Sequence, residues 1–400
     1  MLNSTFLSPT RLIIGANTHQ QAGKWVCAYG GHKVLLHHDS GYVKQCGLVD
    51  EISAALQAEG LEVVELGGVV PNPHLELVYQ GISLCRQEGV DFLLAVGGGS
   101  VIDSTKAIAM GLPYEGDVWD FFVEEDSIPH AIPEKSTPIG VVLTIAATGS
   151  EASNSCVITK ADENLKRFCD NDINRPVFAI ENPMLTMSLP PKQTAYGIID
   201  IMSHSMERYF TPEIGGNELT NRLAEAIFFT CMTCGKILLE HPDDYEARAS
   251  LMLASSLSHN GLTGIGRTGD WASHFIEHEL SGDYNVTHGA GLAVIIPAWM
   301  KYVYRENLPL FYRWATVVMQ VAPSGDQDTV IQTGIARLED FLRSLGAPVR
   351  LGELEGVPAL TEEDFCRMAK RVRKVHPDGS VGWVKQLNTE DIVAIFRLAR

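Results

Sequence analysis

The sequence has no surplus of positive charge. Its 400 residues include 31 Lys and Arg against 49 Asp and Glu, a formal charge of −18. Nucleic acids and anionic membranes attract basic surfaces, so we expect neither as a partner. The sequence also has no uninterrupted apolar run of about 18 residues, the length that would span a bilayer. What remains is the composition of an ordinary globular protein, 45% hydrophobic and 20% charged.

A disulfide framework is also absent. The eight cysteines are scattered, which is usual for reduced thiols of a cytosolic protein. The N-terminus has no basic and then apolar segment of the kind that directs secretion. We therefore expect a cytoplasmic protein of about two or three domains with a large buried core.

The first half of the chain alternates between short apolar strands and helices. Strands are predicted at 33–36, 61–66, 91–96, 138–144 and 177–180. Such alternation is typical of a parallel sheet covered by helices on both faces. From Pro190 and Pro191 onward, helical periodicity takes over. We predict an α/β domain over residues 1–189 and an all-helical domain over residues 190–400.

Three glycines, Gly97, Gly98 and Gly99, follow the strand at 91–96 and open a helix. They remove every Cβ where a pyrophosphate would approach the backbone, and the helix start offers N–H groups and a positive dipole end. The alternative is a capping box formed by Ser100 and Asp103. Because a capping box does not require three glycines, we favour phosphate binding, although the spacing is not G-x-G-x-x-G.

Polar residues follow other predicted strands. Asp39 lies beyond the strand at 33–36, where a carboxylate can hydrogen-bond ribose hydroxyls and repel a 2′-phosphate, which favours NAD over NADP. Turn chemistry alone would also explain this residue. Asn72, which lies between two prolines, is either a turn residue or a ligand contact. The stretch 144–151 suits contacts to diphosphate or ribose, but a plain loop is equally consistent with it.

Metal-ligating residue types cluster in the second half. Asp200 and His204 are four residues apart on a predicted helix, as are His274 and His278, and His288 follows in a loop. Each histidine alone is better explained as an ordinary hydrogen-bonded imidazole. Two pairs that share a helical face, with a fifth group nearby, predict a metal site, and histidine with carboxylate suits zinc or ferrous iron.

A competing motif overlaps this one. His274, Glu277 and His278 also fit the H-x-x-E-H pattern of inverted zinc metallopeptidases, in which Glu277 would be the general base. A peptidase has no use for a glycine-rich phosphate loop. The two hypotheses differ over Glu277, which is essential in a peptidase and expected to be dispensable in a dehydrogenase.

Taken together, these motifs resemble those of the iron-containing alcohol dehydrogenase family, and most closely its butanol dehydrogenase-like, aldehyde-reducing branch. The matching stretches occur in order over nearly the whole chain. They are Gly97-Gly98-Gly99-Ser100-x-x-Asp103-x-x-Lys106, Thr148–Glu151, Leu189–Pro191, Gly197–His204, Asp270–Glu279 and His288-Gly289.

The resemblance implies a dehydroquinate synthase-like fold, with a doubly wound dinucleotide-binding domain followed by an all-helical metal-binding domain. It implies one divalent metal, Fe²⁺ or Zn²⁺, and a homodimer joined through N-terminal strands such as 11–15. The implied metal ligands are Asp200, His204, His274 and His288, and His278 is the implied non-ligand active-site histidine.

The resemblance also implies a set of nicotinamide cofactor contacts. These are Asp39, Asn72, Gly98, Gly99, Ser100, Asp103, Thr144, Thr148, Lys166 and Leu185, with Arg167 as a rival to Lys166. Some relatives carry glycines in place of Asp39 and use NADP, so we expect NAD(H) here. The segment around 162–174 departs from the family pattern, which leaves substrate contacts there in doubt.

The implied reaction is hydride transfer between the nicotinamide and a short aliphatic alcohol or aldehyde, with the metal as Lewis acid and His278 as a proton relay. Polyol dehydrogenases and dehydroquinate synthase share the fold and remain alternatives. Few Lys or Arg residues lie between Asp200 and His288, so we do not expect a strongly anionic substrate. Trp271, Phe275 and Leu262 indicate an apolar pocket, or are simply core.

Overall fold

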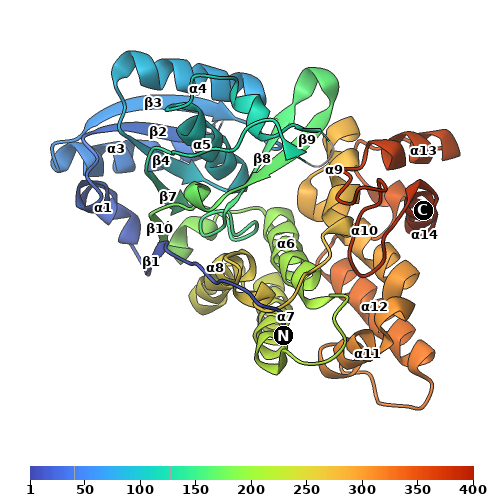
Figure 1. Cartoon of the computed structure of the whole chain (residues 1–400). Helices are drawn as coiled ribbons and strands as arrows, with labels where there is room; N and C mark the ends of the chain where they lie inside the picture. The colour runs from blue at the N-terminus through green and yellow to red at the C-terminus, as the bar shows by residue number, and fades with distance from the viewer. Residues whose placement is uncertain (40, 126–127) are drawn as a thin grey trace. The chain divides into compact units, whose positions relative to one another are not determined.

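The computed structural model describes residues 1–39, 41–125 and 128–400 (Figure 1). Its contacts divide the chain into two compact units. The α/β unit contains residues 7–189 together with 243–260, and the helical unit contains residues 1–6, 190–242 and 261–400. No helix among the described residues is long and apolar enough to cross a membrane.

Among the described residues, six strands form one parallel sheet in the order β1-β10-β7-β4-β2-β3. The strands are β1 (Arg11–Ile14), β2 (Lys33–Asp39), β3 (Glu62–Val69), β4 (Phe92–Gly97), β7 (Ile139–Leu143) and β10 (Phe178–Glu181). The chain passes from β2 to β3 at the edge and then returns to the other side of β2 with β4. Ligands of such sheets bind at the carboxyl ends of the strands where the order reverses, here between β2 and β4.

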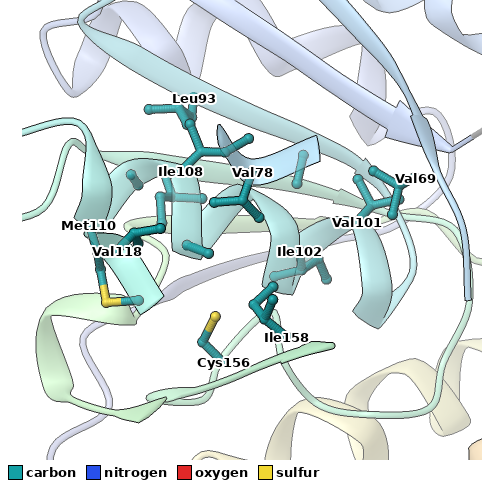
Figure 2. Packing of buried hydrophobic residues seen from close by; sticks show 14 of the residues in the cluster. Val69, Val78, Leu93, Val101, Ile102, Ile108, Met110, Val118, Cys156 and Ile158 are labelled. Carbon is teal, nitrogen blue, oxygen red and sulfur yellow. The ribbon is translucent and has the colours of Figure 1, made fainter. Parts of the chain in front are cut away.

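Helices cover both faces of the sheet, as predicted. They are α1 (Ala22–Ala28), α2 (Tyr42–Gln45) and α3 (Leu48–Ala58) on one face, and α4 (Leu75–Glu88) and α5 (Gly99–Gly111) on the other. Successive strand residues point to opposite faces: Leu93 packs with Val78 and Ile108 on the α4 and α5 side (Figure 2), whereas Leu94 belongs to the other cluster. Burial on both faces explains the nearly continuous apolar runs of these strands.

An antiparallel hairpin was missed by the sequence analysis. Strands β8 (Ser155–Lys160) and β9 (Leu165–Asp170) pair across a turn that places Asn164 in the left-handed region, at φ 53°. Cys156 and Ile158 of β8 pack into the core beside α5 (Figure 2). Strand β9 reads LKRFCD and carries too many charged residues to show strand-like alternation. Two shorter strands, β5 (Glu124–Glu125) and β6 (Ile128–Pro129), pair separately.

The helical unit has no sheet among its described residues, which confirms the predicted all-helical second part of the fold. Helix α6 starts with proline at its first position, where the missing N–H has no cost. Helix α10 packs against both α6 and α9. The helices are α6 (Pro191–Tyr209), α7 (Glu218–Glu240), α9 (Ala272–Tyr284), α10 (His288–Val303), α11 (Leu308–Val317), α12 (Gln327–Ser344), α13 (Glu362–Arg371) and α14 (Thr389–Ala399).

One helix departs from this division by sequence. Helix α8 (Tyr245–His259) follows α7 along the chain, but its contacts place it in the α/β unit. It packs there against β10 and the short helix Pro183–Thr186. As a result, a segment from the second half of the sequence contributes side chains to the α/β unit.

Candidate active site

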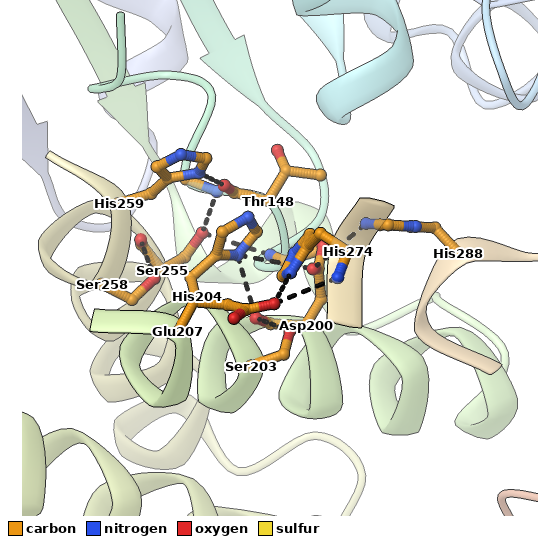
Figure 3. Close-up of polar contacts among 12 residues, drawn as sticks. Thr148, Asp200, Ser203, His204, Glu207, Ser255, Ser258, His259, His274 and His288 are labelled. Carbon is orange, nitrogen blue, oxygen red and sulfur yellow. Dashed lines mark hydrogen bonds and ion pairs between the residues drawn. The ribbon is translucent and has the colours of Figure 1, made fainter. Parts of the chain in front are cut away.

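The helical unit brings the four predicted metal ligands together (Figure 3). Asp200 and His204 lie one turn apart on α6, His274 lies on α9, and His288 is the first residue of α10. The ring centroids of His204 and His274 are 4.8 Å apart, and those of His274 and His288 are 5.3 Å apart. The Nε2 atom of His288 lies 3.9 Å from Oδ1 of Asp200. Three helices therefore present imidazoles and a carboxylate to one small volume.

The hydrogen bonds of the three imidazoles follow one pattern. Nδ1 of His204 lies 2.9 Å from the backbone oxygen of Asp200, and Nδ1 of His274 lies 2.7 Å from Oε1 of Glu207. Nδ1 of His288 contacts the Glu277 carboxylate. Because a carbonyl or ionised carboxylate can only accept, each Nδ1 donates a proton, which leaves the lone pair on Nε2.

These residues fit a divalent metal ion. Nε2 of His274 is buried and has no hydrogen-bond partner among the described residues. A buried acceptor without a partner is costly unless something binds it. Three neutral imidazoles and one carboxylate form a donor set that zinc and ferrous iron accept, and a carboxylate or carbonyl behind each histidine is the usual support for such ligands.

Two supporting carboxylates were not identified as such from the sequence. Glu207 is buried and accepts hydrogen bonds from the His274 ring, the His274 backbone N–H at 3.0 Å and Ser273 Oγ at 2.5 Å. Glu277 is fully buried and contacts His288 and Ser281. Each lies three residues after a predicted ligand on the same helix, which puts it on the same helical face; that spacing is the signal that could have found them.

The environment of Glu277 argues against the peptidase hypothesis. As a general base it would need access to water, but Glu277 is fully buried, and Gly291 packs so closely against it that a Cβ there would lie 2.6 Å from its Oε1. A carboxylate enclosed in this way is suited to holding His288. The contact between Glu277 and His288 argues against the expectation that Glu277 is dispensable in a dehydrogenase.

His278 lies on α9 one turn after His274, with its ring centroid 5.7 Å from that of His288. It is buried next to the ligand cluster. This is the neighbourhood that the resemblance implies for a non-ligand active-site histidine, and its role remains a prediction.

The glycine loop lies at the carboxyl edge of the sheet. Gly98 is the N-cap of α5, and Gly99 and Ser100 are its first residues. A Cβ on Gly98 would lie 2.3 Å from Ile145, and one on Gly99 would lie 2.4 Å from Thr148. The glycines therefore let the loop pack closely against residues 144–148, whose first member, Thr144, donates its N–H to Gly97 at 3.1 Å.

The capping-box alternative is wrong, because Gly98 and not Ser100 caps α5 and no side chain caps it. The Asp103 carboxylate instead accepts hydrogen bonds from Ser150 Oγ at 2.5 Å and from the Val157 N–H at 3.0 Å. Lys106 is fully buried and donates to Ser150 Oγ at 2.9 Å. Burial raises the pKa of Asp103 and lowers the pKa of Lys106. This network fastens the loop and the hairpin to α5.

The other predicted cofactor contacts also lie in the α/β unit. Asp39 ends β2, and its Oδ1 accepts the Gly41 N–H at 2.8 Å. A turn therefore accounts for the hydrogen bonding of one of its two carboxylate oxygens. Asn72 is buried with φ 56°, next to the hairpin that carries the buried Lys166. Leu185 packs against the cluster on the α1 and α3 face of the sheet.

Helix α8 fastens the loop 144–151 from outside the local sequence. Ser255 Oγ accepts the N–H groups of Ala147 and Gly149, both at 3.2 Å. Nδ1 of His259 donates to the backbone oxygen of Thr148 at 2.7 Å (Figure 3). Gly149 has φ 66°, and a Cβ there would lie 2.5 Å from His259 Cβ, so glycine is required. We find no local sequence signal that would have indicated this contact.

A buried acid pair lies behind the same loop. Ser256 Oγ is 2.8 Å from Glu151 Oε1 and 2.6 Å from Glu181 Oε1. Burial, with a contribution from the charge of Glu151, raises the pKa of Glu181 to about 8. At neutral pH the pair therefore holds a proton, and two adjacent buried negative charges are avoided.

The family model for iron-containing alcohol dehydrogenase matches residues 9–183, and the model for the C-terminal part of the Fe-containing alcohol dehydrogenase family matches residues 194–400. The chain is 39% identical to the probable NADH-dependent butanol dehydrogenase 2 of Bacillus subtilis, over 99% of both chains. It is 33% identical to the NADPH-dependent aldehyde reductase of Escherichia coli, over 91% of this chain and 93% of that one.

Among solved structures, NADH-dependent butanol dehydrogenase A from Thermotoga maritima superposes with a TM-score of 0.93 at 39% identity, covering 100% of this chain and 99% of that one. These matches define an oxidoreductase that acts on alcohols or aldehydes. The chain belongs to the iron-containing alcohol dehydrogenase family. Membership implies a nicotinamide cofactor and a divalent metal ion.

Proposed function

We propose that the protein is a metal-dependent, NAD(H)-linked alcohol dehydrogenase that also acts as an aldehyde reductase on short aliphatic substrates. The observation that carries the proposal is the arrangement of three histidines whose Nδ1 atoms are all engaged, beside the Asp200 carboxylate. Relatives named as NADH-dependent butanol dehydrogenases support the substrate class.

In this proposal, Asp200, His204, His274 and His288 hold Fe²⁺ or Zn²⁺, which supplies a Lewis acid for the substrate oxygen. One carboxylate against a divalent charge leaves the site net positive, which favours negative charge on that oxygen. Glu207 and Glu277 keep the imidazole rings oriented. The buried imidazole of His278 moves the proton that the reaction consumes or releases.

The glycine loop is proposed to hold the cofactor diphosphate through the N–H groups at the start of α5, at Gly99 and Ser100. The nicotinamide, when bound, would supply or receive the hydride. Asp39 would accept a hydrogen bond from a ribose hydroxyl with its second oxygen and repel a 2′-phosphate. Since both NADH- and NADPH-dependent relatives occur, this residue is our reason for preferring NAD(H).

The test is NADH oxidation with butanal by protein stripped with a chelator and then given back Fe²⁺ or Zn²⁺. We expect activity to return with metal and to exceed the activity with NADPH, and Asp39→Gly to narrow that difference. Absence of turnover with every short aldehyde, in protein shown to contain metal, would overturn the proposal in favour of a polyol dehydrogenase or a synthase.

We also propose that the protein is a homodimer joined through β1. This strand lies at one edge of the sheet and carries Ile14, which is 42% exposed. An exposed strand edge is a ready pairing surface for a second chain. Light scattering would test the dimer, and a monomer at micromolar concentration would contradict it.

A further inference from the structure

Trp271 has an unusual backbone conformation. It is the N-cap of α9 with φ 72°, in the left-handed region. Five of the seven described non-glycine residues with positive φ are asparagines, which tolerate this region, whereas a bulky aromatic residue does not. Strain of this kind persists only where the surroundings over-determine it, and it is concentrated at functional sites.

Both neighbours of Trp271 are held in place. Glu207 Oε2 accepts the Trp271 N–H at 2.8 Å, and the Glu207 backbone oxygen accepts the Asp270 N–H at 2.7 Å. The Asp270 carboxylate accepts the Ala272 N–H at 3.0 Å and is further held by backbone N–H groups of the segment 383–384. The residue that supports ligand His274 thus also fixes the direction of the indole.

The indole lies against the ligand cluster. Its ring centroid is 5.5 Å from that of His274, at an interplanar angle of 63°, and 6.2 Å from that of His204. The guanidinium of Arg208 lies 4.5 Å over the indole. Trp271 is only half-buried, unlike the core residues Trp299 and Trp314. A core role does not explain a half-exposed indole in a strained position.

We propose that Trp271 determines substrate size, because its indole forms a rigid apolar wall beside the metal ligands. The wall admits slim, unbranched aldehydes and excludes branched or cyclic ones; this inference rests on the proposed function. If the chain needed only a helix start here, glycine would adopt φ 72° without strain. Steric and apolar discrimination of this kind changes relative kcat/KM by about tenfold or more.

The test is Trp271→Gly, which removes the indole and keeps the backbone conformation. We expect bound metal and NADH affinity to stay at wild-type values. The ratio of kcat/KM for cyclohexanecarbaldehyde to that for butanal should rise at least about tenfold. The matched control is Trp25→Ala, because Trp25 is also half-buried and has the guanidinium of Arg11 at 5.0 Å over its ring. In Trp25→Ala, the ratio of kcat/KM for the two aldehydes should stay at the wild-type value.

Loss of metal from Trp271→Gly, or an equal loss of rate with both aldehydes, would overturn the proposal and give Trp271 a purely structural role. A second measurement does not require turnover. Cobalt-loaded protein is titrated with imidazole and with 4-phenylimidazole, and the visible spectrum is followed. Trp271→Gly should bind 4-phenylimidazole at least about tenfold more tightly than wild type, with imidazole unchanged.

The two measurements separate the two proposals. If wild-type protein reduces no aldehyde, the proposed function fails and the titration alone decides the role of Trp271. If wild-type protein reduces butanal but the titration and the kcat/KM ratio are both unchanged in Trp271→Gly, the size-determining role fails and the proposed function stands.

Discussion

The two units stabilise their polar residues in different ways. In the helical unit, two of the three proposed ligand histidines are held by a buried carboxylate, His274 by Glu207 and His288 by Glu277. In the α/β unit, backbone N–H groups of the loop 144–151 donate to the Ser255 hydroxyl of α8, and glycines allow the loop to approach closely. Metal binding in the helical unit should therefore weaken when one charged side chain is removed. Cofactor binding at the loop should weaken when a side-chain volume changes or one hydrogen-bond acceptor is lost.

The largest effect is expected from removing a ligand. His274→Ala deletes one of the three imidazoles, and we expect loss of stoichiometric metal and a fall in kcat/KM of at least about a thousandfold, because a metal's Lewis acidity is worth several kcal/mol. Metal analysis and NADH oxidation check this. His32→Ala, at an exposed histidine, is the control. Full metal content in His274→Ala would remove this residue from the ligand set.

The next effect distinguishes the carboxylates that hold the histidines from the proposed ligands themselves. Glu207→Gln and Glu277→Gln should each weaken metal binding about 10- to 100-fold, with activity recovered in excess metal, because loss of a carboxylate behind a histidine has this magnitude. Competition with a coloured chelator measures the affinity, and the exposed Glu390→Gln is the control. Unchanged affinity in both variants would mean that the two carboxylates do not support the ligands.

In the α/β unit, Ser255→Ala leaves the Ala147 and Gly149 N–H groups without their acceptor. We expect NADH to bind at least about fivefold more weakly while metal content stays constant, since an unsatisfied buried donor costs about 1–3 kcal/mol. Quenching of protein fluorescence by NADH measures the affinity. A loss of metal with unchanged NADH affinity would contradict the contrast drawn between the two units.

The smallest effect concerns pH. The pKa of Glu181 is raised from its ordinary 4.5 to about 8, so the folded chain holds a proton there that the unfolded chain has released. The contribution of the protonated Glu181 carboxyl to the free energy of unfolding is complete below about pH 4.5 and is lost as pH rises through about 8. Glu181→Gln should therefore match wild type near pH 5 and be more stable near pH 9 by at least about 1 kcal/mol. Urea unfolding at both pH values checks this; equal stability at pH 9 contradicts it.

Periodic elements were predictable from the sequence. The predicted strands at 33–36 and 91–96 correspond to β2 and β4. The grouping of the proposed ligand residues was also predictable in part, because a spacing of four residues puts Asp200 and His204 on one helical face whatever surrounds them. What the structure adds at this site is the pair of supporting carboxylates.

Features that depend on packing between distant segments could not be predicted. Ser255 lies over 100 residues from Ala147, and nothing in either local sequence indicates their contact. Strand β9 was missed because its pairing with β8, and not its own alternation, defines it. Trp271 was left open as pocket or core, since positive φ is a property of the folded backbone and not of the residue type.

The most direct test of the metal centre is X-ray absorption on the zinc-loaded protein. We predict a first shell of nitrogen and oxygen at about 2.0–2.1 Å, with outer-shell scattering from three imidazoles. In His274→Ala loaded to the same occupancy, the signal should fall to two imidazoles. A sulfur neighbour at about 2.3 Å, or fewer than three imidazoles in the wild type, would contradict the ligand set Asp200, His204, His274 and His288.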